Sequence, residues 1–258
     1  MVFLPLFDRN PIRYIQSAHV TLAILFLCLC VFFYQVTLSK EAEYIFILMY
    51  GATPSSIFNG TSLSQYESLI PAGFTILTSM FLHGDFMHLA GNMLFLWVLG
   101  DNIEDELGHL RFLLFYVVCG IAGAVAHSLV DITSEIPMIG ASGAISGIIG
   151  AYLILHPKAP IKTLIWFFVI EVPAWLLLGM WTCIQFSNIF FSGSSGIAEV
   201  AWWAHVGGFI TGVILIILFR KKNLKLFDEA MTGVPRYGPR ISLNLSASRL
   251  KSKKNPLK

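Results

Sequence analysis

A serine and a histidine lie in two separate apolar segments, and each is followed by glycines that share one helical face. The glycines recur at helical spacing, and they are Gly143, Gly147 and Gly150 after the serine and Gly208 and Gly212 after the histidine. Helical faces without side chains allow two helices to pack closely. We therefore expect Ser142 and His205 to meet, as a nucleophile and the neutral imidazole that removes its proton.

A packing role is the simpler explanation for the glycines and the serine. Small residues are common wherever membrane helices pack, and a buried serine usually bonds a backbone carbonyl. His205 favours a functional site, because an ionisable residue inside a membrane span is costly. Neither apolar segment offers a carboxylate placed as a third member, so the sequence predicts a Ser142-His205 dyad.

An earlier apolar segment carries two more polar side chains on one face. His88 and Asn92 stand at i and i+4. Attack of a serine on a peptide carbonyl creates an oxyanion, which needs preorganised hydrogen-bond donors. The Asn92 amide, the His88 imidazole and the backbone N–H of Ser142 are the donors that we expect. Hydrolysis also needs water, so these polar groups should line a wet cavity.

The composition is that of a protein that crosses a membrane several times. Of the 258 residues, 56% are hydrophobic and 12% are charged, and the mean hydropathy is +0.73. A soluble domain has about a quarter charged residues, so the composition excludes that class. The cysteines lie in apolar runs without metal-type spacing and predict neither a disulfide nor a zinc site; they are Cys28, Cys30, Cys119 and Cys183.

The hydropathy pattern predicts an all-α membrane protein with six transmembrane helices. The expected spans are residues 17–36, 83–99, 110–130, 142–156, 163–187 and 200–219. With both termini cytoplasmic, Lys40 is the only basic residue on the outer side. The expected domains are a cytoplasmic segment at 1–16, a six-helix domain at 17–219 and a basic cytoplasmic tail at 220–258. The tail is read as a topology signal, in preference to a site for anionic lipid or nucleic acid.

A long first outer loop, Ser39 to Met80, separates the first two spans and is expected to be structured. Its apolar patch from Tyr44 to Tyr50 is too short to cross a membrane, so it either lies in the interface or packs on the bundle. A Gly/Ser-rich outer loop at 192–199 precedes the last span. This topology puts the starts of the second, fourth and sixth spans, and hence the four polar site residues, at similar depth.

Acidic residues occur at two places within or next to the predicted spans. Residues 100–109 are predicted to form a polar turn whose carboxylates cap the following helix. Glu171 and Pro173 fall inside the predicted fifth span, which should therefore bend at the proline. Glu171 either gates water or substrate, or is a neutral carboxyl bonded to a neighbour.

Three motifs resemble the rhomboid family of intramembrane serine proteases. Residues 140–143 resemble the GxSG signature, residues 83–92 the HxxxxHxxxN element, and residues 204–212 the AHxxGxxxG element. They occur in the family's order on the expected spans, and the resemblance covers residues 11–220. It implies a six-helix rhomboid bundle that cuts single-span transmembrane substrates within or just outside the lipid bilayer.

The resemblance also implies roles for individual residues. Ser142 would be the nucleophile, His205 the general base and acid, and His88 and Asn92 the oxyanion site; supporting residues in the same motifs are His83, Gly143 and Gly208. No cofactor, metal or nucleic acid is implied. The N-terminal segment from Pro5 to Pro11 looks like that of bacterial members, which suggests a plasma (inner) membrane location.

The sequence departs from the family in two places. Many relatives carry a Trp-Arg pair in the first outer loop, and residues 39–81 contain none. Some relatives have a tyrosine four residues after the nucleophile, stacked on the catalytic histidine, whereas this chain has Ser146. Other contacts must therefore position His205.

Rival functions remain to be distinguished. A catalytically silent rhomboid-like protein that binds membrane proteins is the principal alternative, although such relatives typically lack the serine or histidine that this chain keeps. A third alternative is a proton relay through His83, His88, His205 and Glu171. Such a relay needs polar residues across the whole bilayer, whereas the polar residues of this chain cluster at the outer end. A zinc protease would need a His-Glu-x-x-His pair, and an aspartyl protease would need two facing intramembrane aspartates, neither of which the sequence offers.

Overall fold

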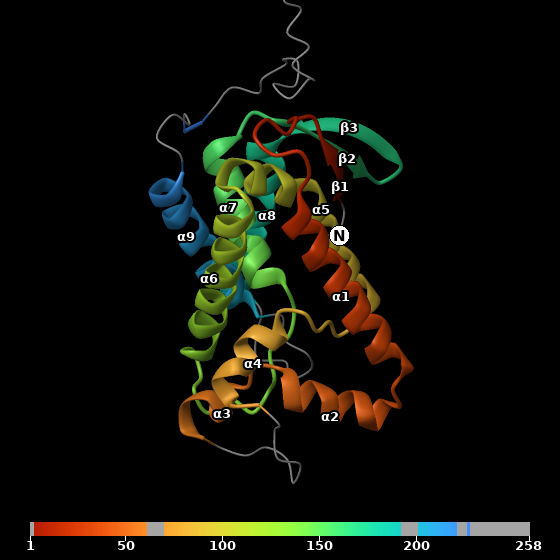
Figure 1. Ribbon diagram of the computed structural model, residues 1–258, viewed down its shortest axis with the longest axis vertical. Coiled ribbons are helices and arrows are strands. Elements are labelled where there is room, and N and C mark those ends of the chain that lie inside the picture. Colours follow the sequence, from red (N-terminus) through yellow and green to blue (C-terminus); the bar gives the residue numbers. More distant parts are fainter. Residues whose placement is uncertain (1–2, 61–69, 192–200, 221–225, 228–258) are drawn as a thin grey trace, which may run out of the picture.

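The computed structural model describes residues 3–60, 70–191, 201–220 and 226–227. Within these ranges the chain forms nine helices and three strands (Figure 1). The helices are α1 (His19–Thr37), α2 (Lys40–Tyr50), α3 (Pro54–Asn59), α4 (Ala72–Ser79), α5 (Phe86–Leu107), α6 (His109–Ser128), α7 (Ser142–Leu155), α8 (Ala174–Phe191) and α9 (Trp202–Phe219). The strands are β1 (Phe3–Asp8), β2 (Pro160–Ile165) and β3 (Phe168–Pro173). The predicted loop at 192–199 and nearly all of the basic tail lie outside the described residues.

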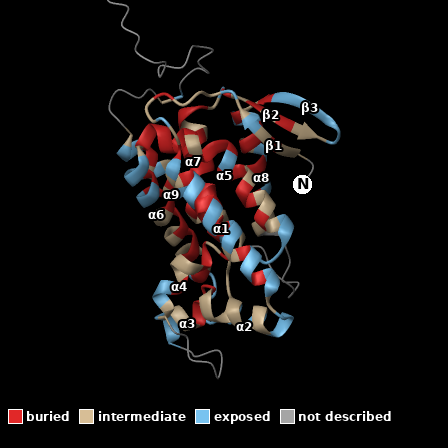
Figure 2. Ribbon diagram, turned by 45° about the vertical axis from the view of Figure 1, so that its right-hand side comes forward, coloured by how far each residue is buried: buried red, intermediate tan, exposed pale blue. Residues whose placement is uncertain are grey.

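Three of the described helices, α1, α6 and α9, are long and apolar enough to cross a membrane. Helix α7 has 14 residues, a length of about 21 Å against a hydrocarbon core of about 30 Å. It packs mainly against α6 and α9, and nearly all of it is buried (Figure 2). The protein is therefore a multi-pass helical membrane protein, and the short helix α7 lies at the centre of its bundle.

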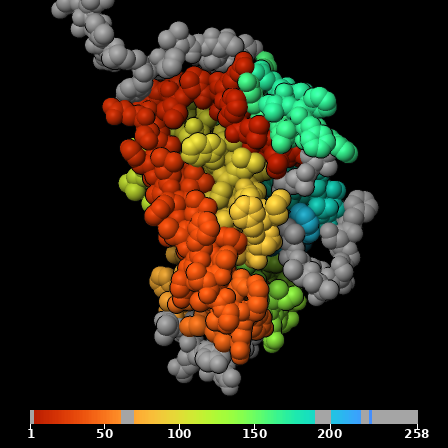
Figure 3. All heavy atoms as spheres, turned by 90° about the vertical axis from the view of Figure 1, so that its right-hand side faces the viewer, coloured from red at the N-terminus to blue at the C-terminus, as the bar shows by residue number. Residues whose placement is uncertain are grey.

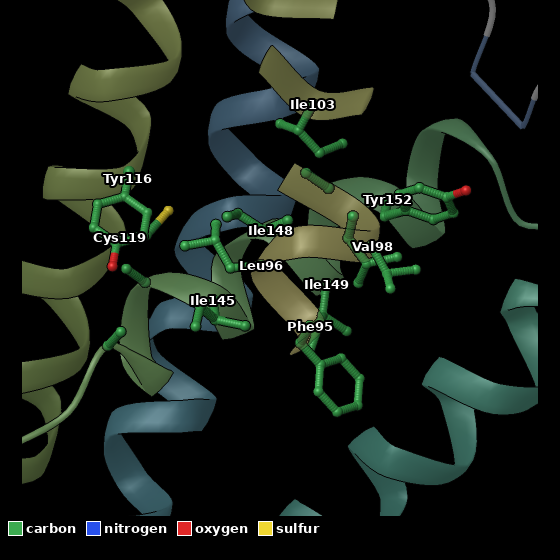
Figure 4. Close-up of a cluster of buried hydrophobic side chains, with 14 of the residues drawn as sticks. Phe95, Leu96, Val98, Ile103, Tyr116, Cys119, Ile145, Ile148, Ile149 and Tyr152 are labelled. Atoms are coloured by element: carbon green, nitrogen blue, oxygen red, sulfur yellow. The ribbon is translucent and has the colours of Figure 1, made fainter. Parts of the chain in front are cut away.

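Large apolar side chains from three helices meet around α7. Figure 4 shows Leu96 and Ile103 of α5, Tyr116 of α6 and Ile148 and Ile149 of α7 converging in one cluster, where each is almost completely buried. Burial of such side chains contributes roughly 1.5–3 kcal/mol each in water. In a membrane, close van der Waals packing of the same surfaces takes that role.

The helices α5, α7 and α9 point in the same direction. Asn102 of α5 and Tyr152 of α7 both donate hydrogen bonds to Oδ2 of Asp8 in β1, at 2.9 and 2.5 Å. The N–H of Phe227, which follows α9, donates to the carbonyl of Ile154 near the end of α7. The C-terminal ends of the three helices thus meet at the end of the molecule that carries the sheet, and their N-terminal ends face α2, α3 and α4 (Figure 1).

The region predicted as the first half of span five is a β-hairpin. Strands β2 and β3 pair antiparallel, and β1 adds to β2 with Phe3 opposite Ile165. Figure 3 shows the hairpin beside the N-terminal residues at one end of the molecule. The prediction of a span at 163–187 is therefore wrong in its first part, because the backbone groups of 160–173 bond to a neighbouring strand; a helix begins only at Ala174.

Glu171 belongs to this hairpin and not to the middle of a span. Its Oε1 lies 2.6 Å from Nη2 of Arg9, and both side chains are substantially exposed. The gate interpretation fails for that reason. The hairpin turns at Trp166, which adopts φ 57°, and at Phe167, whose side chain is 89% exposed. Pro173 ends β3 and bends no helix.

The predicted polar turn at 100–109 is also wrong, since α5 continues to Leu107. The acidic side chains at its end are buried, and they bond backbone N–H groups of the chain before α1 and of its first turn, whereas α6 has no side-chain cap. Asp105 accepts hydrogen bonds from three backbone N–H groups at 2.6–2.7 Å, and their residues are Arg13, Tyr14 and Ile15. Glu104 accepts from the N–H groups of Val20 and Thr21.

The segment from Ser39 to Met80 contains the helices α2, α3 and α4, apart from residues 61–69, which are not described. The apolar patch from Tyr44 to Tyr50 is the C-terminal part of α2, a helix that buries none of its residues. Ser39 caps this helix by accepting a hydrogen bond from the N–H of Ala42 at 3.2 Å. The segment is thus largely helical.

The cysteines are all free thiols. Cys28 and Cys119 are buried, whereas Cys30 and Cys183 are exposed. The different burial of Cys28 and Cys30 agrees with their placement on two faces of α1.

Candidate active site

Ser142 is the first residue of α7, and it is half-buried. Ala141 occupies the N-cap and carries no side chain that can cap the helix. A helix start leaves its first N–H groups without partners inside the helix, and these carry partial positive charge. Without a side-chain cap, the first-turn N–H groups beside Ser142 are suited to receive a developing oxyanion.

The turn before Ser142 is fixed by backbone hydrogen bonds. Gly140 adopts φ +120°, which side-chain-bearing residues rarely adopt, and its N–H donates to the carbonyl of Ser79 at 2.8 Å. Two residues earlier, Met138 exchanges two hydrogen bonds of 2.9 Å with Ala52. The segment that contains α2, α3 and α4 thereby holds the serine turn from outside the bundle.

Glycines bring the backbones of α7 and α9 into direct contact. A Cβ atom on Gly208 would lie 1.9 Å from the carbonyl oxygen of Gly143, and one on Gly212 would lie 2.2 Å from that of Gly147. The glycine stripes identified in the sequence therefore do face each other. This is close small-residue packing of the kind that membrane helices use.

The same contact sets the relative height of the serine and the histidine. A Cβ on Gly143 would lie 3.5 Å from the carbonyl oxygen of Ala204. Ser142 precedes Gly143 and His205 follows Ala204, so the two candidate reacting residues come from adjoining positions on the paired helices. The structure brings together the neighbourhoods of both residues, as the sequence predicts.

His205 is buried, with 7% of its surface exposed, and it has three neighbours that sequence reasoning did not identify. Its Nδ1 lies 2.7 Å from Oε1 of Gln185 in α8. Its ring lies 5.8 Å from that of Trp181 and 5.9 Å from that of Trp202, measured between centroids. Gln185 is a polar residue inside an apolar run, and that signal could have marked it.

Ser146 does not take the place of the stacking tyrosine found in some relatives. Its hydroxyl donates to the carbonyl oxygen of Ser142 at 2.6 Å, one turn back in α7. The two tryptophans therefore supply the ring contacts of His205.

His88 and Asn92 both lie on α5, and they approach the serine turn. A Cβ on Gly140 would lie 2.6 Å from Nε2 of His88 and 3.6 Å from Nδ2 of Asn92. Glycine at 140 thus leaves the space that these two donors occupy. The helix itself begins at Phe86, where Asp85 caps it by accepting from the N–H of His88 at 2.9 Å.

His83 precedes α5 and supports Asn92. Its Nε2 lies 3.0 Å from Nδ2 of Asn92, and its Nδ1 lies 3.3 Å from the carbonyl oxygen of Phe81. With Nδ1–H donating to that carbonyl, Nε2 accepts from the Asn92 amide. The side-chain amide of Gln35 in α1 anchors His83 in turn, because it donates to the His83 carbonyl and accepts from the His83 N–H. All seven site residues named from the sequence therefore gather at the N-terminal ends of α5, α7 and α9.

Among the residues that the structure describes, no three His, Cys, Asp or Glu side chains are grouped as a metal site. The gathered groups instead comprise a hydroxyl, an imidazole held at one nitrogen, and several N–H donors. This set can perform general-base activation of the hydroxyl and can stabilise a negatively charged oxygen.

Comparisons with known proteins agree with the three motifs. Residues 72–222 match the model of the Rhomboid domain. Rhomboid protein 1, mitochondrial, from Saccharomyces cerevisiae is 30% identical over 154 residues, which are 57% of this chain and 42% of the yeast protein. Rhomboid protease GluP from Bacillus subtilis is 42% identical over 92 residues, 35% of this chain and 18% of that protein.

Plant proteins are similar over comparable stretches. RHOMBOID-like protein 5 from Arabidopsis thaliana is 38% identical over 78 residues, 30% of this chain and 25% of the plant protein. The chain thus spans less than half the length of each of these relatives.

Proposed function

Because this chain belongs to the rhomboid family, we propose that it is an intramembrane serine endopeptidase. It cuts single-span membrane proteins in or near their transmembrane segments. The observation that carries the proposal is the position of Ser142 at an uncapped helix start, beside the backbone contact that brings in the helix of His205. A related protein from Bacillus subtilis is named as a protease.

The reaction would proceed through an acyl-enzyme. His205 Nε2 takes the hydroxyl proton while Ser142 Oγ bonds to the substrate carbonyl carbon, and the carbonyl oxygen becomes negatively charged. His205 then gives that proton to the leaving amine as the C–N bond breaks. A water molecule, deprotonated by the same imidazole, attacks the ester and releases the second product and Ser142.

The oxyanion would be stabilised by the N–H of Ser142, the amide of Asn92 and the ring of His88. His83 holds Asn92 at 3.0 Å, which favours one fixed position of that donor. Loss of one oxyanion donor typically reduces turnover by roughly 100- to 1,000-fold. Preorganisation by His83 should therefore contribute to catalysis without direct contact with the substrate.

The proposed topology has six spans, formed by α1, α5, α6, α7, α8 and α9, with both termini in the cytoplasm. The parallel direction of α5, α7 and α9 supports it, because alternate spans must run the same way. The sheet would then lie on the cytoplasmic side, and α2, α3 and α4 on the outer side. We retain the domain bounds 1–16, 17–219 and 220–258, with the addition that β1 pairs with β2.

The membrane that holds this protein in the cell remains a prediction. The N-terminal segment resembles bacterial members, which favours the plasma membrane. The similar proteins include bacterial, mitochondrial and chloroplast members, so they do not favour one compartment.

The test is cleavage of a labelled single-span membrane protein by the purified protein in detergent, beside Ser142→Ala and His205→Ala. Wild type should cut, and both variants should be silent. A fluorophosphonate that labels wild type but not Ser142→Ala would show an active site even if the substrate panel were too narrow. No cleavage together with no labelling would support the alternative, a catalytically silent rhomboid-like binding protein.

A further inference from the structure

We propose that Gln185 is a positioning residue of this site, whose side-chain amide holds the His205 ring with Nε2 turned toward Ser142. The inference rests on the proposed protease function and adds a third polar member to the expected dyad. Gln185 would not touch the substrate or the reacting atoms. It would act by fixing the tautomer and the rotation of the base.

The contact is short and lies away from solvent. Gln185 Oε1 lies 2.7 Å from His205 Nδ1, and each residue has only 7% of its surface exposed. The two residues come from different helices, α8 and α9, so the bond is a tertiary contact. A buried amide in an apolar helix is unfavourable unless its polar atoms find partners.

The orientation of the amide follows from its second hydrogen bond. Gln185 Nε2 donates to the carbonyl of Trp181, one turn earlier in α8, at 3.4 Å. A flipped amide would put Oε1 against that carbonyl, which is an acceptor facing an acceptor. The oxygen of the amide therefore faces His205.

The tautomer of His205 follows from that oxygen. A carbonyl oxygen only accepts hydrogen bonds, so Nδ1 of His205 must carry a hydrogen. In the neutral ring the lone pair then lies on Nε2, the nitrogen that a general base needs on the serine side. Without this bond, the two tautomers would compete and part of the enzyme would hold its lone pair on the wrong nitrogen.

The ring contacts fix the location of the imidazole, and the hydrogen bond to Gln185 fixes its rotation. The rings of Trp181 and Trp202 lie 5.8 and 5.9 Å from it and limit its sideways movement. Aromatic contacts fix the location of a ring better than its rotation about χ2. Gln185 supplies the directional contact, and Ser146 does not, because its hydroxyl bonds the carbonyl of Ser142.

The test compares Gln185→Leu with Gln185→Glu in cleavage and fluorophosphonate-labelling assays over a range of pH. Leucine removes the acceptor, and we expect kcat to fall roughly 10- to 100-fold with KM within about twofold, as when the partner that orients a metal-binding histidine is lost. Glutamate keeps an acceptor for Nδ1, but its second oxygen faces the carbonyl of Trp181, so it should recover part of the activity. Its carboxylate also favours the imidazolium, so the acid limb of the pH profile should move about one unit or more to higher pH.

Cys183→Ala is the matched control, because Cys183 is an exposed residue of α8 two positions away. It should retain wild-type rates. Equal kcat in Gln185→Leu and wild type would overturn the positioning role, as would a Gln185→Glu profile with an unmoved acid limb. Wild type and Ser142→Ala are measured in the same series. Inactivity of wild type toward both substrate and fluorophosphonate would instead be a failure of the proposed function.

Discussion

Replacement of Gly208 by alanine is expected to separate the helices that carry Ser142 and His205. The added Cβ would lie 1.9 Å from the carbonyl oxygen of Gly143. That oxygen belongs to the backbone of a buried helix, so no side chain can rotate out of the way. Relief of the overlap requires α7 and α9 to move apart where the serine and the histidine meet.

The size of the movement can be worked from this contact. Ordinary contact of a Cβ begins near 3.4 Å, so the helices must separate by about 1.5 Å, and a misplacement of about 1 Å at a catalytic site can reduce the rate about 100-fold. The expected loss of kcat/KM is therefore at least about two orders of magnitude, equivalent to about 2.7 kcal/mol. Close packing between α7 and α9 should weaken at the same time, which lowers the Tm.

The assay is kcat/KM for a labelled single-span substrate, measured with the Tm in the same detergent. Gly179→Ala is the control, because a Cβ at Gly179 in α8 would meet no atom within 4 Å. It should keep both the rate and the Tm of wild type. A Gly208→Ala variant with a rate within threefold of wild type would refute the claim that this contact sets the distance between the reacting groups.

Three other changes test the surroundings of the site. Asp105→Ala leaves three backbone N–H groups without their acceptor, so the free energy of unfolding should fall by about 2–4 kcal/mol; an unchanged Tm in detergent would contradict this. Burial raises the pKa of the Asp8 carboxyl to about 7, from 3.8. The folded state therefore binds the proton of Asp8 more tightly than the unfolded state does. The resulting contribution to the free energy of unfolding is fully present below about pH 4, and it is lost as the pH rises toward 7. The Tm of wild type should therefore fall from pH 5 to pH 8, and Asp8→Asn should remove this part of the fall; parallel curves would argue against it. In a variant whose exposed Cys30 and Cys183 are replaced by alanine, a polarity-sensitive dye on Phe167→Cys should be quenched by brominated lipid in nanodiscs, because the hairpin tip is apolar and exposed. The same dye on Lys40→Cys should respond to aqueous iodide instead, and a dye at 167 that responds only to iodide would exclude lipid contact.

The helices around the site could be predicted because their sequence signals are local. The glycines of α7 and α9 have a spacing that only a helix turns into one face, and their contact in the structure has that form. His88 and Asn92 likewise share a face through their i, i+4 spacing on α5. Motif order and helix direction then suffice to bring these residues to one end of the bundle.

The hairpin at 160–173 could not be predicted from hydropathy. Residues 164–170 are apolar and lie only three residues before the apolar helix α8, so a window of the length of a span joins the two elements. The turn contains no glycine, proline or asparagine that would mark it in the sequence. The positive φ that such a turn needs is adopted by Trp166 instead. β2 also pairs with β1, which lies far away in the sequence, so hydropathy alone does not reveal this part of the sheet.

The role of the acidic end of α5 also depended on distant residues. A helix with several carboxylates near its C-terminus is unfavourable for its own dipole, and the sequence therefore favours a turn. The structure compensates because Asp105 accepts hydrogen bonds from N–H groups before α1, and Glu104 accepts them from N–H groups in the first turn of α1. The partner of Gln185 could not be predicted for the same reason, since His205 lies on another helix.

The pairing of β1 with β2 has a consequence for the order in which the protein is made. Phe3 lies opposite Ile165, so β1 leaves the ribosome about 160 residues before its partner, which is about 8–30 s at usual rates of synthesis. During that time the mainly apolar segment that becomes β1 has no partner strand. Its unpaired backbone N–H and C=O groups could pair with those of other chains. Pro5 removes one N–H donor from this strand, and the register shifts between Pro5 and Phe7. The irregular strand is thereby a poor template for other chains, yet it still fits its own β2 once that strand has been synthesised.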